Sequence, residues 1–81
     1  MDFKYEPNRI YLERDGHLLA EITFPLKGDE ATIDHTFVDE SLRGQGIASK
    51  LVSLAVSKIT ENGWKVNATC PYAIKWIREH Q

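Results

Sequence analysis

Cysteine is almost absent from this sequence: Cys70 is the only one in 81 residues. No disulfide can therefore form within the chain, and a lone thiol is typical of a protein in a reducing compartment, so we expect a cytoplasmic location. Long apolar runs are absent too, and none approaches the roughly 20 residues that span a bilayer. The first residues contain no apolar segment of the kind found in secretory signal peptides. The sequence predicts a soluble chain with no membrane partner.

An excess of basic charge is also lacking. Twelve Asp and Glu residues outweigh ten Lys and Arg, the formal net charge is −2, and the basic residues are scattered along the chain. Because nucleic-acid binding needs a concentrated basic face, we expect no nucleic-acid partner. The three histidines, His17, His35 and His80, fall in separate predicted elements, and no Cys/His pair has ligand spacing, so we expect no metal site. At this length the chain should form a single domain, residues 1–81.

The first half of the chain is predicted to be an antiparallel meander. Two β-prone runs, residues 9–14 and 17–26, flank Asp15-Gly16, and Asp-Gly between such runs is a strong signal for a two-residue hairpin turn. A second turn at residues 27–29 leads into a third strand, residues 30–38, in which apolar and polar residues alternate. The alternation places on one face of that strand Ala31, Ile33, His35 and Phe37.

The second half is predicted to be helical with one further strand. Apolar residues between Ile47 and Thr60 cover about half of a helical wheel, which is typical of a helix that lies on a sheet. Residues 64–69 then resemble a strand that returns parallel to the strand before the helix. Pro71 suits the first position of a short C-terminal helix. The predicted fold class is α+β, with a meander followed by a β-loop-α-β crossover.

The segment between the third strand and the long helix, Arg43-Gly44-Gln45-Gly46-Ile47-Ala48, is the strongest candidate for a binding site. A short glycine-containing loop at this place directs free backbone N–H groups and the positive end of a helix toward one spot, where a phosphate binds well. The glycines let the backbone approach the phosphate closely. The alternative is a strand-to-helix turn that uses glycine for its geometry alone.

Two common phosphate loops do not fit this segment. The chain has no Gly-x-x-x-x-Gly-Lys-Ser/Thr motif, so it is not a P-loop protein. A dinucleotide fingerprint needs a third glycine where Ser49 stands, and it opens repeated β-α-β units rather than a meander of hairpins.

The loop resembles a different family. Arg43-x-x-Gly46-x-Ala48 matches the Gln/Arg-x-x-Gly-x-Gly/Ala signature of the GNAT superfamily of acyl-CoA-dependent N-acetyltransferases. The wider segment 34–48, followed by Cys-Pro-Tyr-Ala at 70–73, is similar to the very small YjdJ-type GNAT-like proteins, which contain little more than the acetyl-CoA-binding core. The resemblance covers most of the chain.

This resemblance implies that acetyl-CoA (or CoA) is the cofactor and that it binds where two parallel strands splay apart. Phe37 and Val38 should then offer backbone groups to the pantetheine arm. Ser49 and Lys50 should lie close to the pyrophosphate. The backbone N–H groups expected to hold the pyrophosphate are those of Arg43, Gly44, Gln45, Gly46, Ile47 and Ala48.

Three residues are candidates for catalysis. Cys70 precedes the predicted C-terminal helix, and a thiol at a helix N-terminus can have a lowered pKa and act as a nucleophile, which would permit an acetyl-cysteine intermediate. The family resemblance points to the same cysteine. The alternative is a free cysteine that is merely a small buried apolar residue. His35 could be a general base or could orient Cys70, although a lone histidine is more often a hydrogen-bonded structural residue. Tyr72 could protonate the leaving CoA thiolate, or it could simply pack in the last helix.

Two functions remain open at this point. The chain could be an enzyme that transfers an acetyl group from acetyl-CoA to an unidentified amine, a small molecule or a protein. It could instead be a module that binds and delivers or senses acetyl-CoA without turnover. The resemblance to such small proteins implies an acceptor site that is shallow or is completed by a partner, because the helices that form the acceptor pocket of full-size GNAT enzymes are missing.

Overall fold

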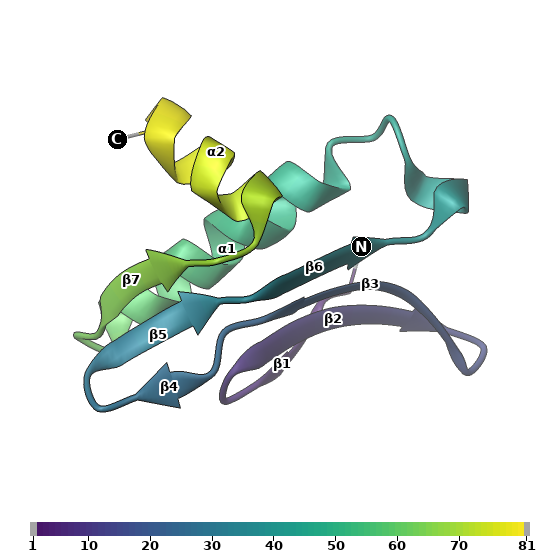
Figure 1. Cartoon of the computed structure of the whole chain (residues 1–81). Helices are drawn as coiled ribbons and strands as arrows, with labels where there is room; N and C mark the ends of the chain where they lie inside the picture. The colour runs from purple at the N-terminus through teal and green to yellow at the C-terminus, as the bar shows by residue number, and fades with distance from the viewer. Residues whose placement is uncertain (1, 81) are drawn as a thin grey trace.

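The computed structural model describes residues 2–80 and contains two β-sheets and two α-helices (Figure 1). One sheet has the strand order β1-β2-β3-β6 and the other has the order β4-β5-β7. The elements in chain order are β1 (Lys4–Glu6), β2 (Arg9–Arg14), β3 (His17–Thr23), β4 (Leu26–Lys27), β5 (Glu30–Ile33), β6 (His35–Val38), the 3-10 helix η1 (Glu40–Leu42), α1 (Ile47–Glu61), β7 (Lys65–Ala68) and α2 (Pro71–His80). The predicted α+β class is confirmed. Neither α1 nor α2 is long and apolar enough to cross a membrane.

The first hairpin forms where the sequence predicts it. β2 and β3 pair antiparallel, with Arg14 opposite His17. The two turn residues both have positive φ, 51° at Asp15 and 79° at Gly16, as a two-residue turn that matches the strand twist requires. β3 ends at Thr23, two residues before Pro25, and the backbone N–H of Phe24 donates to the carbonyl of Asn8. This hairpin forms the centre of the four-stranded sheet.

The predicted strand 30–38 is in fact two strands that belong to different sheets. β5 pairs with β4 and with β7, whereas β6 pairs with β3. The chain bends at Asp34, whose N–H donates to the Thr23 carbonyl and whose carboxylate accepts a hydrogen bond from the Thr23 hydroxyl. Because this bend resets the alternation, Ala31 and Ile33 are buried but His35 is exposed. The prediction that these residues and His35 share one face is therefore wrong.

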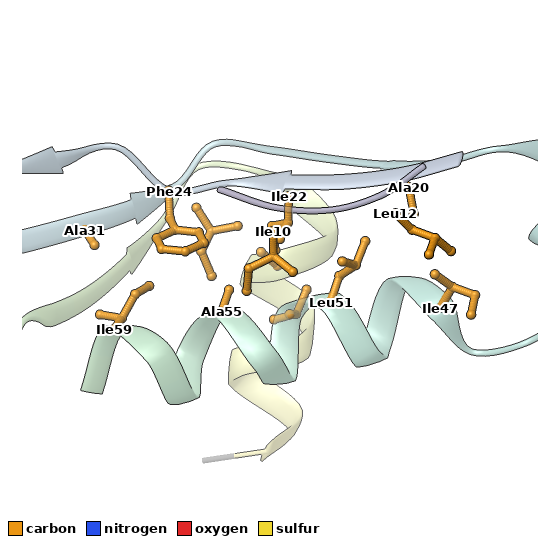
Figure 2. Close-up of a cluster of buried hydrophobic side chains, with 13 residues drawn as sticks. Ile10, Leu12, Ala20, Ile22, Phe24, Ala31, Ile47, Leu51, Ala55 and Ile59 are labelled. Atoms are coloured by element: carbon orange, nitrogen blue, oxygen red, sulfur yellow. The ribbon is translucent and has the colours of Figure 1, made fainter. Parts of the chain in front are cut away.

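Helix α1 lies along one side of the sheets, and its apolar side chains point at the strands (Figure 2). Each fully buried Leu or Ile contributes about 1.5–3 kcal/mol relative to an exposed position, so this layer holds the strands on the helix. The buried residues that α1 contributes are Ile47, Leu51, Val52, Ala55 and Ile59. Those that face them from the strands and the segment after β3 are Ile10, Leu12, Ala20, Ile22, Phe24, Ala31 and Ile33.

Helix α2 lies beside α1 on the same side of the sheets (Figure 2) and contacts both α1 and β7. It begins at Pro71, as predicted, and buries Ala73. β7 runs parallel to β5, with Ala68 opposite Ile33. The chain thus passes from β5 through β6 and α1 to β7, which pairs parallel with β5, as the predicted β-loop-α-β crossover requires.

Candidate functional site

The parallel pairing of β5 with β7 ends at Ile33 and Ala68, and beyond this point the two segments separate. The carbonyl of Ile33 accepts hydrogen bonds from the N–H groups of both Thr69 (3.0 Å) and Cys70 (3.2 Å). Beyond this point β6 continues beside β3, while the other segment turns into α2 (Figure 1). The two segments diverge from a vertex at Ile33 and Cys70, and this is the splay that the family resemblance implies.

The divergence leaves one edge of β6 without a partner strand among the described residues, since β6 is the last strand of its sheet. Val38 lies opposite Ala20, and the N–H of Asp39 donates to the Leu19 carbonyl at 2.8 Å. In an antiparallel ladder this pattern makes Val38 a non-hydrogen-bonded residue, so its own N–H and C=O point to the open edge. By the same rule the backbone groups of Phe37 point toward β3. The backbone N–H and C=O of Val38 are therefore free to bond a ligand at the edge, whereas those of Phe37 are directed at β3.

The chain leaves β6 through a short, well-capped 3-10 turn. The carboxylate of Asp39 accepts hydrogen bonds from the hydroxyl (2.6 Å) and the backbone N–H (3.0 Å) of Ser41. These two hydrogen bonds lower the pKa of Asp39 below its usual range. The N–H of Arg43 donates to the carbonyl of Glu40 and ends the turn. The start of the loop is thus fixed by local hydrogen bonds.

The loop then reaches α1 through two glycines in the left-handed region, with φ of 81° at Gly44 and 73° at Gly46. Gly46 is the N-cap of α1 and supplies no side-chain acceptor, and the first N–H bonded within the helix is that of Lys50, which donates to the Gly46 carbonyl. Among residues 2–80 we find no protein acceptor for the N–H groups from Gly44 to Ser49. These donors lie at the positive end of the helix dipole and form a site for an anion.

A pocket of about 340 Å³ lies between this loop, the free edge of β6 and the start of α2. Its volume is in the range of small-molecule sites. Eight of the residues that the sequence predicts for the site line it: Val38, Arg43, Gly44, Gly46, Ile47, Ala48, Ser49 and Tyr72. Five others do not line it: Phe37, Gln45, Lys50, His35 and Cys70. Gln45 lines a neighbouring hollow beside His17 and Asp39. The two lining residues that sequence reasoning missed are Thr36 and Leu42.

Cys70 lies at the vertex, next to the pocket. Its Sγ atom is 3.7 Å from the Oγ1 atom of Thr36, which lines the pocket from β6. Its carbonyl accepts the N–H of Ile74, so Cys70 is the residue that precedes the first turn of α2. The thiol and the Thr36 hydroxyl therefore lie on the two diverging segments and face each other. Thr36 could have been found from the sequence, because it shares a strand face with Val38 two residues later.

His35 is placed differently from the prediction. Its Nε2 atom is 3.5 Å from Glu21 Oε1, and its side chain is 54% exposed. Glu21 also accepts a hydrogen bond from Arg9 Nε at 2.5 Å. Because neighbouring side chains on a strand point to opposite faces, His35 lies on the other side of β6 from Thr36. The expectation that His35 orients Cys70 is therefore wrong, and Thr36 occupies the place that we expected His35 to take.

The comparison with protein families agrees with this geometry. A family model described as GCN5-related N-acetyl-transferase matches residues 9–81, which is most of the chain. The chain belongs to this family. It is thus a GNAT protein in which the loop at Gly44–Ser49 and the splayed segments are both present.

Solved structures show the same fold. A GCN5-like protein from Staphylococcus aureus is 33% identical, with a TM-score of 0.79, and the match covers 98% of this chain and 79% of that one. The ribosomal-protein-S18-alanine N-acetyltransferase from Escherichia coli is 20% identical, with a TM-score of 0.71 over 94% of this chain and 53% of that enzyme. The aminoglycoside N-acetyltransferase AAC(6')-Iy, solved in complex with CoA, has a TM-score of 0.55 at 19% identity and covers 78% of this chain and 55% of its own. The last two establish likeness of fold.

The curated relatives include protein NATD1 from Homo sapiens, which is 35% identical over 48 residues. That alignment covers 59% of this chain and 42% of the human protein. The chain therefore matches less than half the length of these relatives.

Proposed function

We propose that this GNAT protein binds acetyl-CoA in the pocket at the start of α1 and transfers the acetyl group to an amine. The observation that carries the proposal is the row of N–H groups from Gly44 to Ser49, at the helix N-terminus, that have no acceptor within residues 2–80. A diphosphate provides several acceptor oxygens and negative charge, which both the N–H groups and the helix dipole favour. The exposed Arg43 lines the same pocket and supplies positive charge.

The free edge of β6 is the proposed track for the pantetheine arm. The arm carries amide groups, and the outward N–H and C=O of Val38 provide one donor and one acceptor for them. The strand leads from the phosphate loop back toward Thr36 and the vertex at Cys70. A thioester at the end of the arm would then lie beside the Cys70 thiol.

We propose that Cys70 is the nucleophile. The Cys70 thiol gives its proton to solvent, and the thiolate attacks the carbonyl carbon of the acetyl thioester. A new C–S bond forms at Cys70 Sγ, and the bond to the CoA sulfur breaks. CoA leaves as a thiolate and takes a proton from the hydroxyl of Tyr72, a residue of the pocket lining, which regains a proton from solvent. An amine then attacks the acetyl-cysteine, forms the amide and releases the Cys70 thiol. Direct attack of the amine on acetyl-CoA is the simpler route to the same product.

A second candidate function is binding of acetyl-CoA without turnover. It is favoured by one observation: both helices of residues 2–80 lie on the same side of the sheets (Figure 2), so within these residues no helix covers the other face. Glu21 and His35 lie on that other face, opposite the buried Ala20 and Ile22. An acceptor that approached from this face would meet an open surface rather than a pocket. The amine would then have to be held by a partner or not at all.

Intact-mass spectrometry after incubation with acetyl-CoA tests the proposal. The wild type should gain the mass of one acetyl group, and Cys70→Ala should not gain it while still binding CoA in a calorimetric titration. Binding without acetylation in the wild type would leave direct transfer or the non-catalytic module, which added amines would then separate. Absence of any CoA binding would refute both candidate functions.

A further inference from the structure

A side chain from α2 makes a hydrogen bond to the phosphate loop region. The indole Nε1 of Trp76 donates to the hydroxyl oxygen of Ser49 at 2.9 Å. Ser49 is the third residue of α1 and lines the pocket, whereas Trp76 lies one helical turn after Tyr72 and outside the lining. This hydrogen bond therefore links helix α2 to the proposed anion site at the start of α1.

The Trp76 ring is held in place from its other side. The imidazole of His80 stacks on it, with the ring centroids 3.9 Å apart and the planes 8° from parallel. The Nδ1 atom of His80 also lies 2.8 Å from the Trp76 carbonyl. The contact with the carbonyl holds the imidazole in place, and the stacked imidazole in turn restricts the indole whose N–H donates to Ser49.

The hydrogen bond from Trp76 affects how the Ser49 hydroxyl can bond to other groups. A serine hydroxyl has one proton to donate and two lone pairs to accept with, whereas an indole N–H can only donate. A hydroxyl within a helix commonly donates back to a carbonyl three or four residues earlier. Thr60, at the other end of α1, does this with the carbonyls of Val56 and Ser57. Within residues 2–80 the structure contains no such bond from Ser49.

We infer that Trp76 is a positioning residue for the diphosphate of CoA: by donating to Ser49 Oγ, it leaves the Ser49 hydroxyl proton directed into the pocket, where it donates to a phosphate oxygen. The inference rests on the proposed function of the pocket. It adds one side-chain donor to the backbone N–H groups of the loop. It also gives α2 a part in cofactor binding through a residue that does not itself contact the cofactor.

The test compares two ligands that differ in the diphosphate. CoA carries the diphosphate, and pantetheine has the same arm without any phosphate. Calorimetric titrations with both ligands are made on the wild type, Trp76→Phe, Ser49→Ala and the double variant. Trp64→Phe is the matched control, because Trp64 is also half-buried against the core but, within residues 2–80, its indole makes no hydrogen bond to a residue of the pocket lining.

We expect Ser49→Ala to weaken CoA binding about tenfold or more, as the loss of a hydrogen bond to a charged group does. Trp76→Phe should weaken it less, by about three- to tenfold, because the hydroxyl is kept but is no longer oriented. The double variant should bind CoA no more weakly than Ser49→Ala alone, since the indole acts through the hydroxyl. Pantetheine binding should not change in any variant, and Trp64→Phe should bind both ligands as the wild type does.

Equal weakening of CoA and pantetheine by Trp76→Phe would overturn the inference, because it would indicate a general packing role. Unchanged CoA affinity in Trp76→Phe, or additive losses in the double variant, would overturn it too. The wild type supplies a readout that needs no variant: CoA, but not pantetheine, should shift the NMR signal of the Trp76 indole N–H. If the wild type binds no CoA, the proposed function fails and the inference with it. If the wild type binds CoA and Trp76→Phe binds it with the same affinity, the inference is refuted but the proposed function stands.

Discussion

Replacement of Gly46 by alanine tests whether the backbone conformation of the loop serves cofactor binding. Gly46 caps α1 with φ of 73°, and a Cβ added there would have no heavy atom of the described residues within 4 Å, apart from Gly46 and its two chain neighbours. The substitution therefore introduces no clash within the protein, only the left-handed conformation, which costs a non-glycine residue roughly 1–2 kcal/mol. Gly63, at the other end of the helix, has φ of 76° and equally open surroundings. It is the matched control, because it differs from Gly46 mainly in its distance from the pocket.

The conformational cost of alanine in the left-handed region can appear either as lost stability or as lost CoA affinity. If the free Gly46→Ala protein keeps the native loop, it loses roughly 1–2 kcal/mol of unfolding free energy, which lowers the melting temperature by about 4–8 °C per kcal/mol in a domain of this size. If the loop relaxes instead, the same energy must be supplied on binding, and CoA affinity falls by about 5- to 30-fold. The two losses together should amount to at least about 1 kcal/mol.

Thermal unfolding followed by circular dichroism and CoA titration by calorimetry measure the two losses on the same samples. Gly63→Ala should lose a similar amount in total, but entirely as stability, with CoA affinity unchanged. The reasoning would be refuted if both variants weakened CoA binding equally, or if Gly46→Ala changed neither stability nor affinity.

Three further predictions concern the core, the turn and the vertex. Leu51→Ala, at a fully buried position of α1, should lower the unfolding free energy by about 2–5 kcal/mol in urea denaturation, and a loss below 1 kcal/mol would contradict the packing described above. Hydrogen bonds from Ser41 lower the pKa of Asp39 in the folded state. The ionised carboxylate therefore stabilises the fold above the unfolded-state pKa of about 4, and this stabilisation is lost as the pH falls through the lower folded-state pKa. Asp39→Asn should melt at a lower temperature than the wild type at pH 7 and at nearly the same temperature in acid, and a difference that stays constant with pH would contradict this. Thr36→Val keeps the volume but removes the hydroxyl 3.7 Å from the Cys70 sulfur, and it should slow acetylation of Cys70 in the mass assay without weakening CoA binding; an unchanged rate would exclude a role for the hydroxyl.

Much of the fold could be predicted because local signals and tertiary structure agree. Asp15-Gly16 specifies a hairpin turn through its backbone conformation, the apolar arc from residue 47 onward requires a helix on a sheet, and Pro71 suits the start of a helix. Each of these elements occurs within a residue or two of its predicted position. The position of the loop at Arg43–Ala48 before the long helix could be predicted for the same reason, since glycines between a strand and a helix indicate a turn from local sequence alone.

The errors lie where tertiary contacts override the local pattern. Periodicity alone treats residues 30–38 as one strand, but the bend at Asp34 depends on hydrogen bonds to Thr23, a partner eleven residues earlier. That bend exchanges the faces, so that Thr36 rather than His35 comes next to Cys70. The backbone direction of Phe37 likewise follows from its register with β3, which no single-strand pattern contains. The link between Trp76 and Ser49 joins two helices and has no signal in the spacing of residues.

An NMR titration of the ¹⁵N-labelled protein with CoA tests the central claim most directly, because it reports on each backbone N–H separately. Saturable shifts are predicted for the N–H groups from Gly44 to Ser49 and for Val38 on the free edge of β6, with no comparable change along β1 or the outer face of β2. Saturable shifts confined to other parts of the molecule, or no shifts at all, would contradict the assignment of this pocket as the acetyl-CoA site.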